Sequence, residues 1–94
     1  MQVFVTPNAE QDFDTIVLNI QEKWGARTAR QFLIKTDKVL RLLENFPSMG
    51  PVEDGDIRGL QLSPQIRILY RIVGKRIVIL SFFNTRQDPE RRFR

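Results

Sequence analysis

Two β-prone runs meet at Gly74-Lys75 within residues 66–83, IRILYRIVGKRIVILSFF. Apolar and mostly β-branched side chains recur at every second position of each run, which is the period of a strand. A Gly-Lys pair with glycine first suits a two-residue hairpin turn. The pattern therefore predicts an antiparallel hairpin of residues 66–73 and 76–83, with Val73 opposite Arg76.

This register predicts two faces of different character. One face is mostly apolar and is the predicted core face. The other face is half basic and half apolar, which is unusual for a sheet face exposed to water, so we interpret it as a binding surface. The alternative is that its arginines serve solubility or cross-strand pairing. The predicted core face carries Ile66, Ile68, Tyr70, Ile72, Ile77, Ile79, Ser81 and Phe83, and the predicted binding face carries Arg67, Leu69, Arg71, Val78, Leu80 and Phe82.

Two amphipathic helices are predicted before the hairpin. Thr6-Pro7 provides a cap and a residue suited to the first helical position, and Gly25 ends the first helix. Apolar residues recur at steps of three and four along this helix, so we expect Phe13 and Trp24 to be core residues. A second apolar stripe predicts another helix over residues 26–45, antiparallel to the first.

The predicted element order is β-α-α-β-β-β. Residues 1–5 and 57–62 complete the strands, and residues 48–56 are predicted as a loop. The fold class is therefore α+β, with a helical hairpin packed on one face of a small, mainly antiparallel sheet. A length of 94 residues suits one such domain, so we assign residues 1–94 to a single domain.

The charge of the chain is unevenly distributed. Residues 1–56 contain six Lys/Arg and nine Asp/Glu, whereas residues 57–94 contain nine Lys/Arg and two Asp/Glu. This asymmetry favours a polyanion or an acidic protein as partner, although a basic surface also aids solubility. We expect neither a signal peptide nor a membrane span, and the absence of cysteine fits a cytoplasmic protein.

Several kinds of catalytic chemistry lack the residues that they need. The chain has no His, no Cys and no phosphate-binding glycine loop, so we expect no covalent or metal-dependent catalysis and no cofactor. Glu53, Asp54 and Asp56 lack the spacing of a calcium loop and are interpreted as a solvated acidic loop. Tyr70 is the only tyrosine, and its place on the predicted core face indicates a structural role.

Arginines are the remaining candidates for a functional site. A guanidinium group holds phosphate or carboxylate through two parallel hydrogen bonds. Arg67 and Arg71 lie on one strand and point the same way. A solvated tail is the alternative for the C-terminal arginines. The further candidates are Arg58, early in the preceding strand, Arg86, after the last strand, and Arg91 and Arg92.

Taken in order, several motifs resemble toxins of the RelE/ParE superfamily, and the likeness covers nearly the whole chain. The similar segments begin the first helix, end the helical hairpin, form the middle strands and include the last strand with the arginine after it. They are TPNAEQDF (6–13), LENFPSMG (43–50), IRGL (57–60), IRILYRIV (66–73) and IVILSFFNTRQDP (77–89).

The resemblance implies the toxin of a type II toxin–antitoxin system, with a basic sheet face that a cognate antitoxin covers in a hetero-oligomer. ParE-like members inhibit DNA gyrase, whereas RelE-like members are ribosome-dependent mRNA endoribonucleases. In the second case Arg67 and Arg86 match catalytic arginines, and Arg58 roughly matches a basic strand position. In either case the antitoxin- or target-binding residues would be Arg67, Leu69, Arg71, Val78, Leu80, Phe82, Arg91 and Arg92.

One departure from the cleaving members separates the alternatives. Their C-terminal Tyr or His is missing here, and the chain ends in QDPERRFR. Arginine stabilises phosphorane charge well, but it is a poor proton shuttle because it stays protonated. We therefore favour gyrase inhibition over mRNA cleavage. A basic nucleic-acid-binding module is the third alternative, although only Phe82 accompanies the arginines for base stacking.

Overall fold

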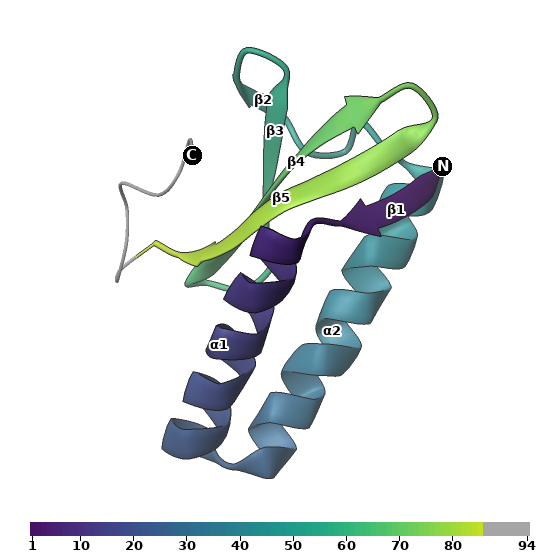
Figure 1. Cartoon of the computed structure of the whole chain (residues 1–94). Helices are drawn as coiled ribbons and strands as arrows, with labels where there is room; N and C mark the ends of the chain where they lie inside the picture. The colour runs from purple at the N-terminus through teal and green to yellow at the C-terminus, as the bar shows by residue number, and fades with distance from the viewer. Residues whose placement is uncertain (86–94) are drawn as a thin grey trace.

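The computed structural model describes residues 1–85 and contains two helices and a five-stranded sheet (Figure 1). This architecture confirms the α+β class and the helical hairpin packed on one face of the sheet. Within the part described, neither helix is long and apolar enough to cross a membrane. The elements are β1 (Gln2–Val5), α1 (Pro7–Trp24), α2 (Ala26–Asn45), β2 (Val52–Asp54), β3 (Ile57–Gln61), β4 (Ile66–Val73) and β5 (Arg76–Asn84).

The strands are ordered β1-β5-β4-β3-β2 across the sheet. β1 runs parallel to β5, and the other neighbours are antiparallel, so the sheet is mainly antiparallel as predicted. The prediction that residues 48–56 form a loop is wrong in part, because the strand β2 lies within them. A strand of three residues, two of them acidic, is too short to show a period of two.

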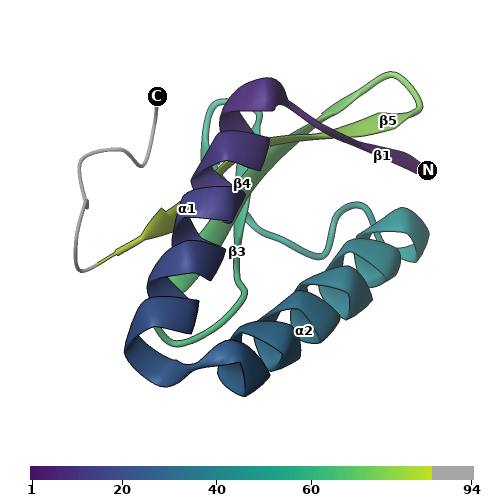
Figure 2. The same cartoon turned by 60° about the horizontal axis from the view of Figure 1, so that its bottom comes forward.

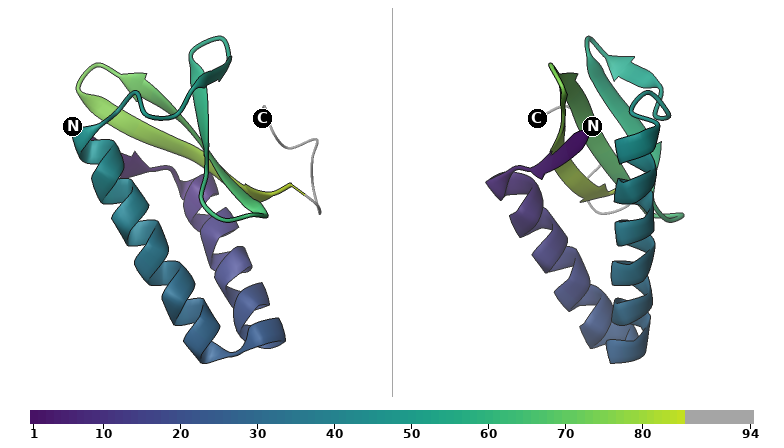
Figure 3. Two further views of the ribbon diagram at one scale, coloured as in Figure 1. Left: turned by 180° about the vertical axis from the view of Figure 1, so that it is seen from behind. Right: turned by 90° about the vertical axis from the view of Figure 1, so that its right-hand side faces the viewer.

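Both helices lie on the same side of the sheet, side by side and antiparallel (Figures 2 and 3). The Thr6 Oγ1 atom accepts a hydrogen bond from the backbone N–H of Ala9 at 3.1 Å and caps α1. Gly25 has φ +93°, which favours glycine, and it joins α1 to α2. The expected core role of Trp24 is wrong: this residue is 71% exposed. It is the last residue of α1, and this end of the helix lies far from β1 (Figure 1).

The core lies between the helices and the face of the sheet turned toward them. The ring of Phe13 lies 5.7 Å from that of Phe32 on α2 and 5.2 Å from that of Phe82 on β5, measured between centroids. Aromatic contacts thus join both helices to the sheet. The predicted core roles of Phe13 and Tyr70 are confirmed. The other buried members of the cluster are Ala9, Leu43, Leu60, Leu62, Ile66, Ile68, Ile77 and Ile79.

A β-bulge changes the face on which the end of β5 lies. Pairing starts with Val73 opposite Arg76 as predicted, but the register shifts by one residue between Leu69 and Tyr70 of β4. Because one extra residue in a strand moves later side chains to the other face, Phe82 joins the core and Phe83 pairs with Arg67. The prediction that Phe82 shares a face with the arginines is therefore wrong.

Candidate functional site

The candidate site is the face of β3, β4 and β5 turned away from the helices. Residues directly opposite each other in an antiparallel sheet point to the same side, so the strand registers identify its members. Of the six residues predicted for this surface, all but Phe82 lie on it. We call it the arginine face, and the registers assign to it Gly59, Gln61, Arg67, Leu69, Arg71, Val78 and Phe83. Leu80 is the unpaired residue of the bulge, and alternation from Val78 puts it on the same face, whereas Ser81 bonds to Asp12 on the helix side.

Arg67 lies at the end of the arginine face where β3 ends, and it is held on two sides. Its Nη2 atom forms an ion pair with the Oε2 atom of Glu53, and its Nη1 atom donates to the Oε1 atom of Gln61 at 2.9 Å. The side chains of Arg67 and Glu53 are only 20% and 8% exposed, so this pair is largely shielded from water. A shielded pair is screened less by salt than a surface pair.

Arg71 makes a more open ion pair. Its Nη2 atom lies 3.0 Å from the Oδ1 atom of Asp56, and the two side chains are 39% and 67% exposed. Ion pairs this accessible contribute little to folding, about 0–1 kcal/mol. The Nε atoms of Arg67 and Arg71 are both buried without a hydrogen-bond partner within residues 1–85. Each guanidinium therefore keeps part of its donor capacity unused.

Gly59 allows the shielded pair to lie directly over β3. A Cβ atom at this position would overlap the carboxylate of Glu53 and would approach the Nη2 atom of Arg67 to 2.8 Å. We interpreted Glu53, Asp54 and Asp56 as a solvated acidic loop. This is wrong for Glu53, whose side chain is shielded against Arg67. Asp56 is exposed as expected, but it also forms an ion pair with Arg71. Asp54 is exposed. The sequence contains no signal for these contacts, because they depend on β2 folding back along β3.

Arg58 lies on the opposite side of the sheet from Arg67 and Arg71. It pairs with Tyr70, a core residue, and its Nη1 atom donates to the carbonyl oxygens of Gly50 at 2.8 Å and Ser48 at 3.3 Å. These contacts fix the segment between α2 and β2. The three arginines that we grouped as catalytic candidates are thus not brought together: Arg58 points away from Arg67, and Arg86 lies outside the described residues, as do Arg91 and Arg92.

Tyr70 fastens the same segment from the core. Its hydroxyl donates to the carbonyl oxygen of Pro47 at 2.8 Å and accepts from the N–H of Gly50 at 2.9 Å. Burial raises the pKa of the Tyr70 phenol, while the Gly50 N–H and the charge of Arg58 act in the opposite direction. The side chain is fully buried and faces away from the arginine face. The predicted structural role of Tyr70 is confirmed.

The apolar part of the arginine face is only partly accessible. Leu69 and Phe83 are buried, whereas Val78 and Leu80 are half-buried. A partner would therefore meet the edges of Val78 and Leu80 beside the two arginines. Within residues 1–85, an aromatic ring for stacking is not available there, because Phe83 is 2% exposed and Phe82 is in the core.

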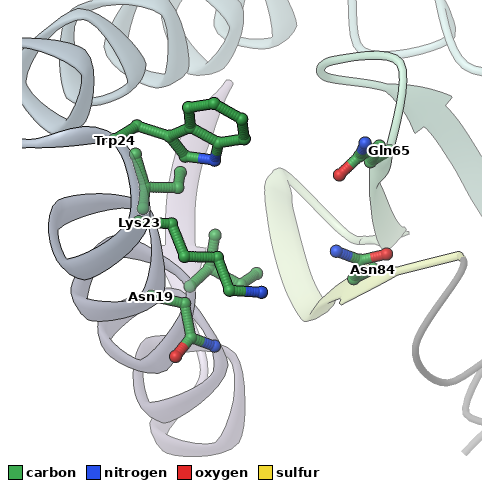
Figure 4. A pocket seen from close by; sticks show the side chains of 7 residues that line it. Asn19, Lys23, Trp24, Gln65 and Asn84 are labelled. Atoms are coloured by element: carbon green, nitrogen blue, oxygen red, sulfur yellow. The ribbon is translucent and has the colours of Figure 1, made fainter.

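A separate hollow of about 300 Å³ lies on the other side of the molecule, between α1 and the ends of β4 and β5 (Figure 4). Among the described residues that line it, Lys23 is the only charged one. Because Arg67 and Arg71 lie on the face of the sheet turned away from the helices, this hollow is separate from them. Its lining residues are Ile16, Asn19, Ile20, Lys23, Trp24, Gln65 and Asn84.

Comparison with known proteins agrees with this geometry. Residues 3–89 match the family described as the ParE toxin of type II toxin–antitoxin system, parDE. A structure of the chromosomal ParDE system from P. aeruginosa superposes with a TM-score of 0.77 at 24% identity, covering 89% of this chain and 95% of that one. No curated protein sequence matches.

Two further solved structures share the fold. A copper-bound mutant toxin from Helicobacter pylori gives a TM-score of 0.67 at 14% identity, covering 93% of this chain and 97% of its own. A YoeB/ParE toxin from Agrobacterium tumefaciens gives 0.66 at 15% identity, covering 89% and 98%. The fold is thus that of the RelE/ParE superfamily of toxins. Within that superfamily, the chain belongs to the ParE toxin family of type II toxin–antitoxin systems.

Proposed function

We propose that this toxin inhibits DNA gyrase and that a cognate antitoxin neutralises it by covering the arginine face. The observation that carries the proposal is that, among residues 1–85, neither a histidine nor a tyrosine lies beside Arg67 and Arg71, and the two carboxylates there, Glu53 and Asp56, are held in ion pairs with them. The chain has no histidine, and its one tyrosine is buried on the other side of the sheet with its hydroxyl bonded to Pro47 and Gly50. Membership of the ParE family points in the same direction.

Ribosome-dependent mRNA cleavage is the competing function. Attack by a 2′-hydroxyl needs a base, a stabiliser of phosphorane charge and a proton donor to the leaving oxygen. Arg67 is suited to the second task alone, and Glu53 already neutralises it. A basic nucleic-acid-binding module is supported still less, because the residues of the arginine face that the structure describes expose no aromatic ring on which a base would stack.

Growth experiments test the proposed function. Induced alone, the toxin should arrest growth and switch on a DNA-damage reporter, because gyrase trapped on cleaved DNA leaves double-strand breaks. Co-expression of the neighbouring small gene should restore growth. Normal growth at high soluble expression would contradict a toxin, whereas arrest without the damage response would contradict gyrase as its target.

Charge reversal tests the placement of the antitoxin. Arg71→Glu should weaken the complex with the neighbouring gene product by about tenfold or more at low salt, and by less at high salt, because ions screen an exposed charge. Arg30→Glu is the matched control, since Arg30 is exposed on α2, on the other side of the sheet. Equal affinities for the two variants, measured by calorimetry, would place the antitoxin elsewhere.

A further inference from the structure

Two acidic residues of the β2–β3 hairpin lie against the arginine face. Glu53, within β2, contacts Arg67, and Asp56, just before β3, contacts Arg71. Gly55, with φ +58°, forms the tight turn between the two acids. One short hairpin thus places a carboxylate on each of the two arginines of the face.

The two ion pairs leave the arginines incompletely satisfied. Each uses the Nη2 atom, while each Nε atom is buried without a hydrogen-bond partner in residues 1–85. A carboxylate that approaches an arginine from the side normally binds both Nε and Nη2. Glu53 and Asp56 therefore neutralise the two guanidinium groups without bonding to their Nε atoms. A carboxylate that replaced either acid and bonded to both Nε and Nη2 would gain one hydrogen bond.

β2 is the element best placed to yield to such a competitor. It has three residues, lies at the edge of the sheet, and pairs with β3 in an irregular register (Figures 1 and 3). Short edge strands are among the parts of a fold that open at low free energy. Movement of β2 and the turn after it, with β3 left in place, would leave the β4–β5 pairing and the core cluster unchanged, since no residue of β2 belongs to that cluster.

We propose that Glu53 and Asp56 are internal competitors, which hold Arg67 and Arg71 until an acidic segment of a partner protein exchanges its own carboxylates for theirs. The exchange rests on the proposed function only in that the antitoxin binds this face. This exchange makes Glu53 and Asp56 specificity-determining residues. A polyanion without apolar groups must displace both carboxylates and gains only charge contacts. A partner that also carries apolar groups gains additional contacts with Val78 and Leu80.

The kind of partner follows from the groups around the arginines. The anions that the chain itself places there are carboxylates, and the accessible neighbours Val78 and Leu80 are aliphatic. Nucleic acid would need an exposed aromatic ring for base stacking, and Phe83 is buried. An acidic protein segment with apolar side chains therefore fits better than a single-stranded nucleic acid.

The test measures how purified variants bind two defined probes. Glu53→Gln and Asp56→Asn remove one negative charge each while keeping the shape of the side chain. Asp54→Asn is the matched control: it makes the same change in net charge in the same hairpin, at an exposed residue with no ion pair in the part of the chain described. The probes are a fluorescein-labelled dodecaglutamate and a labelled dodecathymidylate, titrated at low and at physiological ionic strength.

We expect Glu53→Gln to tighten dodecaglutamate binding by about tenfold, because its pair with Arg67 is shielded. Asp56→Asn should tighten it by about two- to threefold, because its pair is exposed and screened. Asp54→Asn should change it by less than about twofold. In an Arg67→Gln background the gain from Glu53→Gln should fall to that of the control, which isolates the pairwise effect.

Each other outcome counts against part of the proposal. If Glu53→Gln and Asp56→Asn bind dodecaglutamate no better than Asp54→Asn, the acids are structural and do not compete. If only dodecathymidylate gains affinity, the face takes phosphate and the assignment to an acidic protein segment is wrong. Should Glu53→Gln not fold, Asp56→Asn still decides, since its carboxylate is largely exposed. None of these results depends on whether the chain arrests growth.

Discussion

Tyr70 shows how a single residue couples the core to the segment that precedes β2. Its ring is fully buried, and its hydroxyl bonds to the backbone of Pro47 and Gly50. Arg58 reaches the same segment from β3 through the carbonyl oxygens of Ser48 and Gly50. Because both side chains serve this purpose, neither is available to the arginine face.

The raised pKa of Tyr70 predicts a loss of stability in alkaline solution. Burial favours the neutral phenol, so above the ordinary pKa of about 10 the unfolded chain loses this proton before the folded chain does. The free energy of unfolding contributed by this group should therefore hold up to about pH 10 and fall as the pH rises toward the folded pKa. Because the chain has one tyrosine, phenolate absorbance titrates Tyr70 alone.

Tyr70→Phe is the control for this prediction. It should lower stability by about 1–3 kcal/mol at neutral pH through its two lost hydrogen bonds. It should also remove most of the extra decline above pH 10 in urea unfolding. A phenol that titrates at or below its ordinary pKa in the folded protein would contradict the description of Tyr70 as buried.

At this scale the sequence predicted the strand residues better than the loop residues. Alternation along residues 66–73 correctly placed Arg67 and Arg71 together and Tyr70 in the core. The contacts of Glu53 and Asp56 were not predictable, because they join segments 14 and 15 residues away in sequence through a turn that leaves no periodic pattern. The side-chain direction of Arg58 required the register between β3 and β4.

Among the elements, β5 departs most from its sequence pattern. The hairpin register predicted from Gly74-Lys75 holds for the first four residue pairs and then shifts at the bulge, so Phe82 and Phe83 exchange faces. A bulge adds a residue without altering the hydrophobic character of the run, so alternation alone gives no sign of it. Phe82 is held on the core side by its contact with Phe13 on α1.

The bulge predicts unequal effects of two neighbouring substitutions. Phe82→Ala should lower the free energy of unfolding by about 3–5 kcal/mol, because it leaves a cavity beside Phe13. Leu80→Ala should cost about 1 kcal/mol, since Leu80 is half-buried and outside the core cluster. Urea unfolding of both variants checks this order. The reverse order would mean that β4 and β5 keep the register of the turn along their whole length.

For the whole molecule, the order of elements and the hydrophobic periods were sufficient to predict the α+β class and the side of the sheet that binds the helices. The edge strand β2 was missed because three residues are too few to show a pattern. The exposure of Trp24 was missed because a helical stripe does not reveal where the sheet ends. The superfamily resemblance indicated the toxin class, which the family match over residues 3–89 then established.

The target is decided most directly by incubating the purified toxin with gyrase, ATP and plasmid DNA, and in parallel with translating ribosomes. We expect loss of supercoiling and accumulation of gyrase-bound cleaved DNA, with intact mRNA on the ribosomes. Codon-position cuts in mRNA that require the ribosome, together with unaffected gyrase, would contradict it. In that case Arg67→Ala and Arg86→Ala should each slow cleavage by about 10²-fold or more, and a ribosomal group would have to supply the proton.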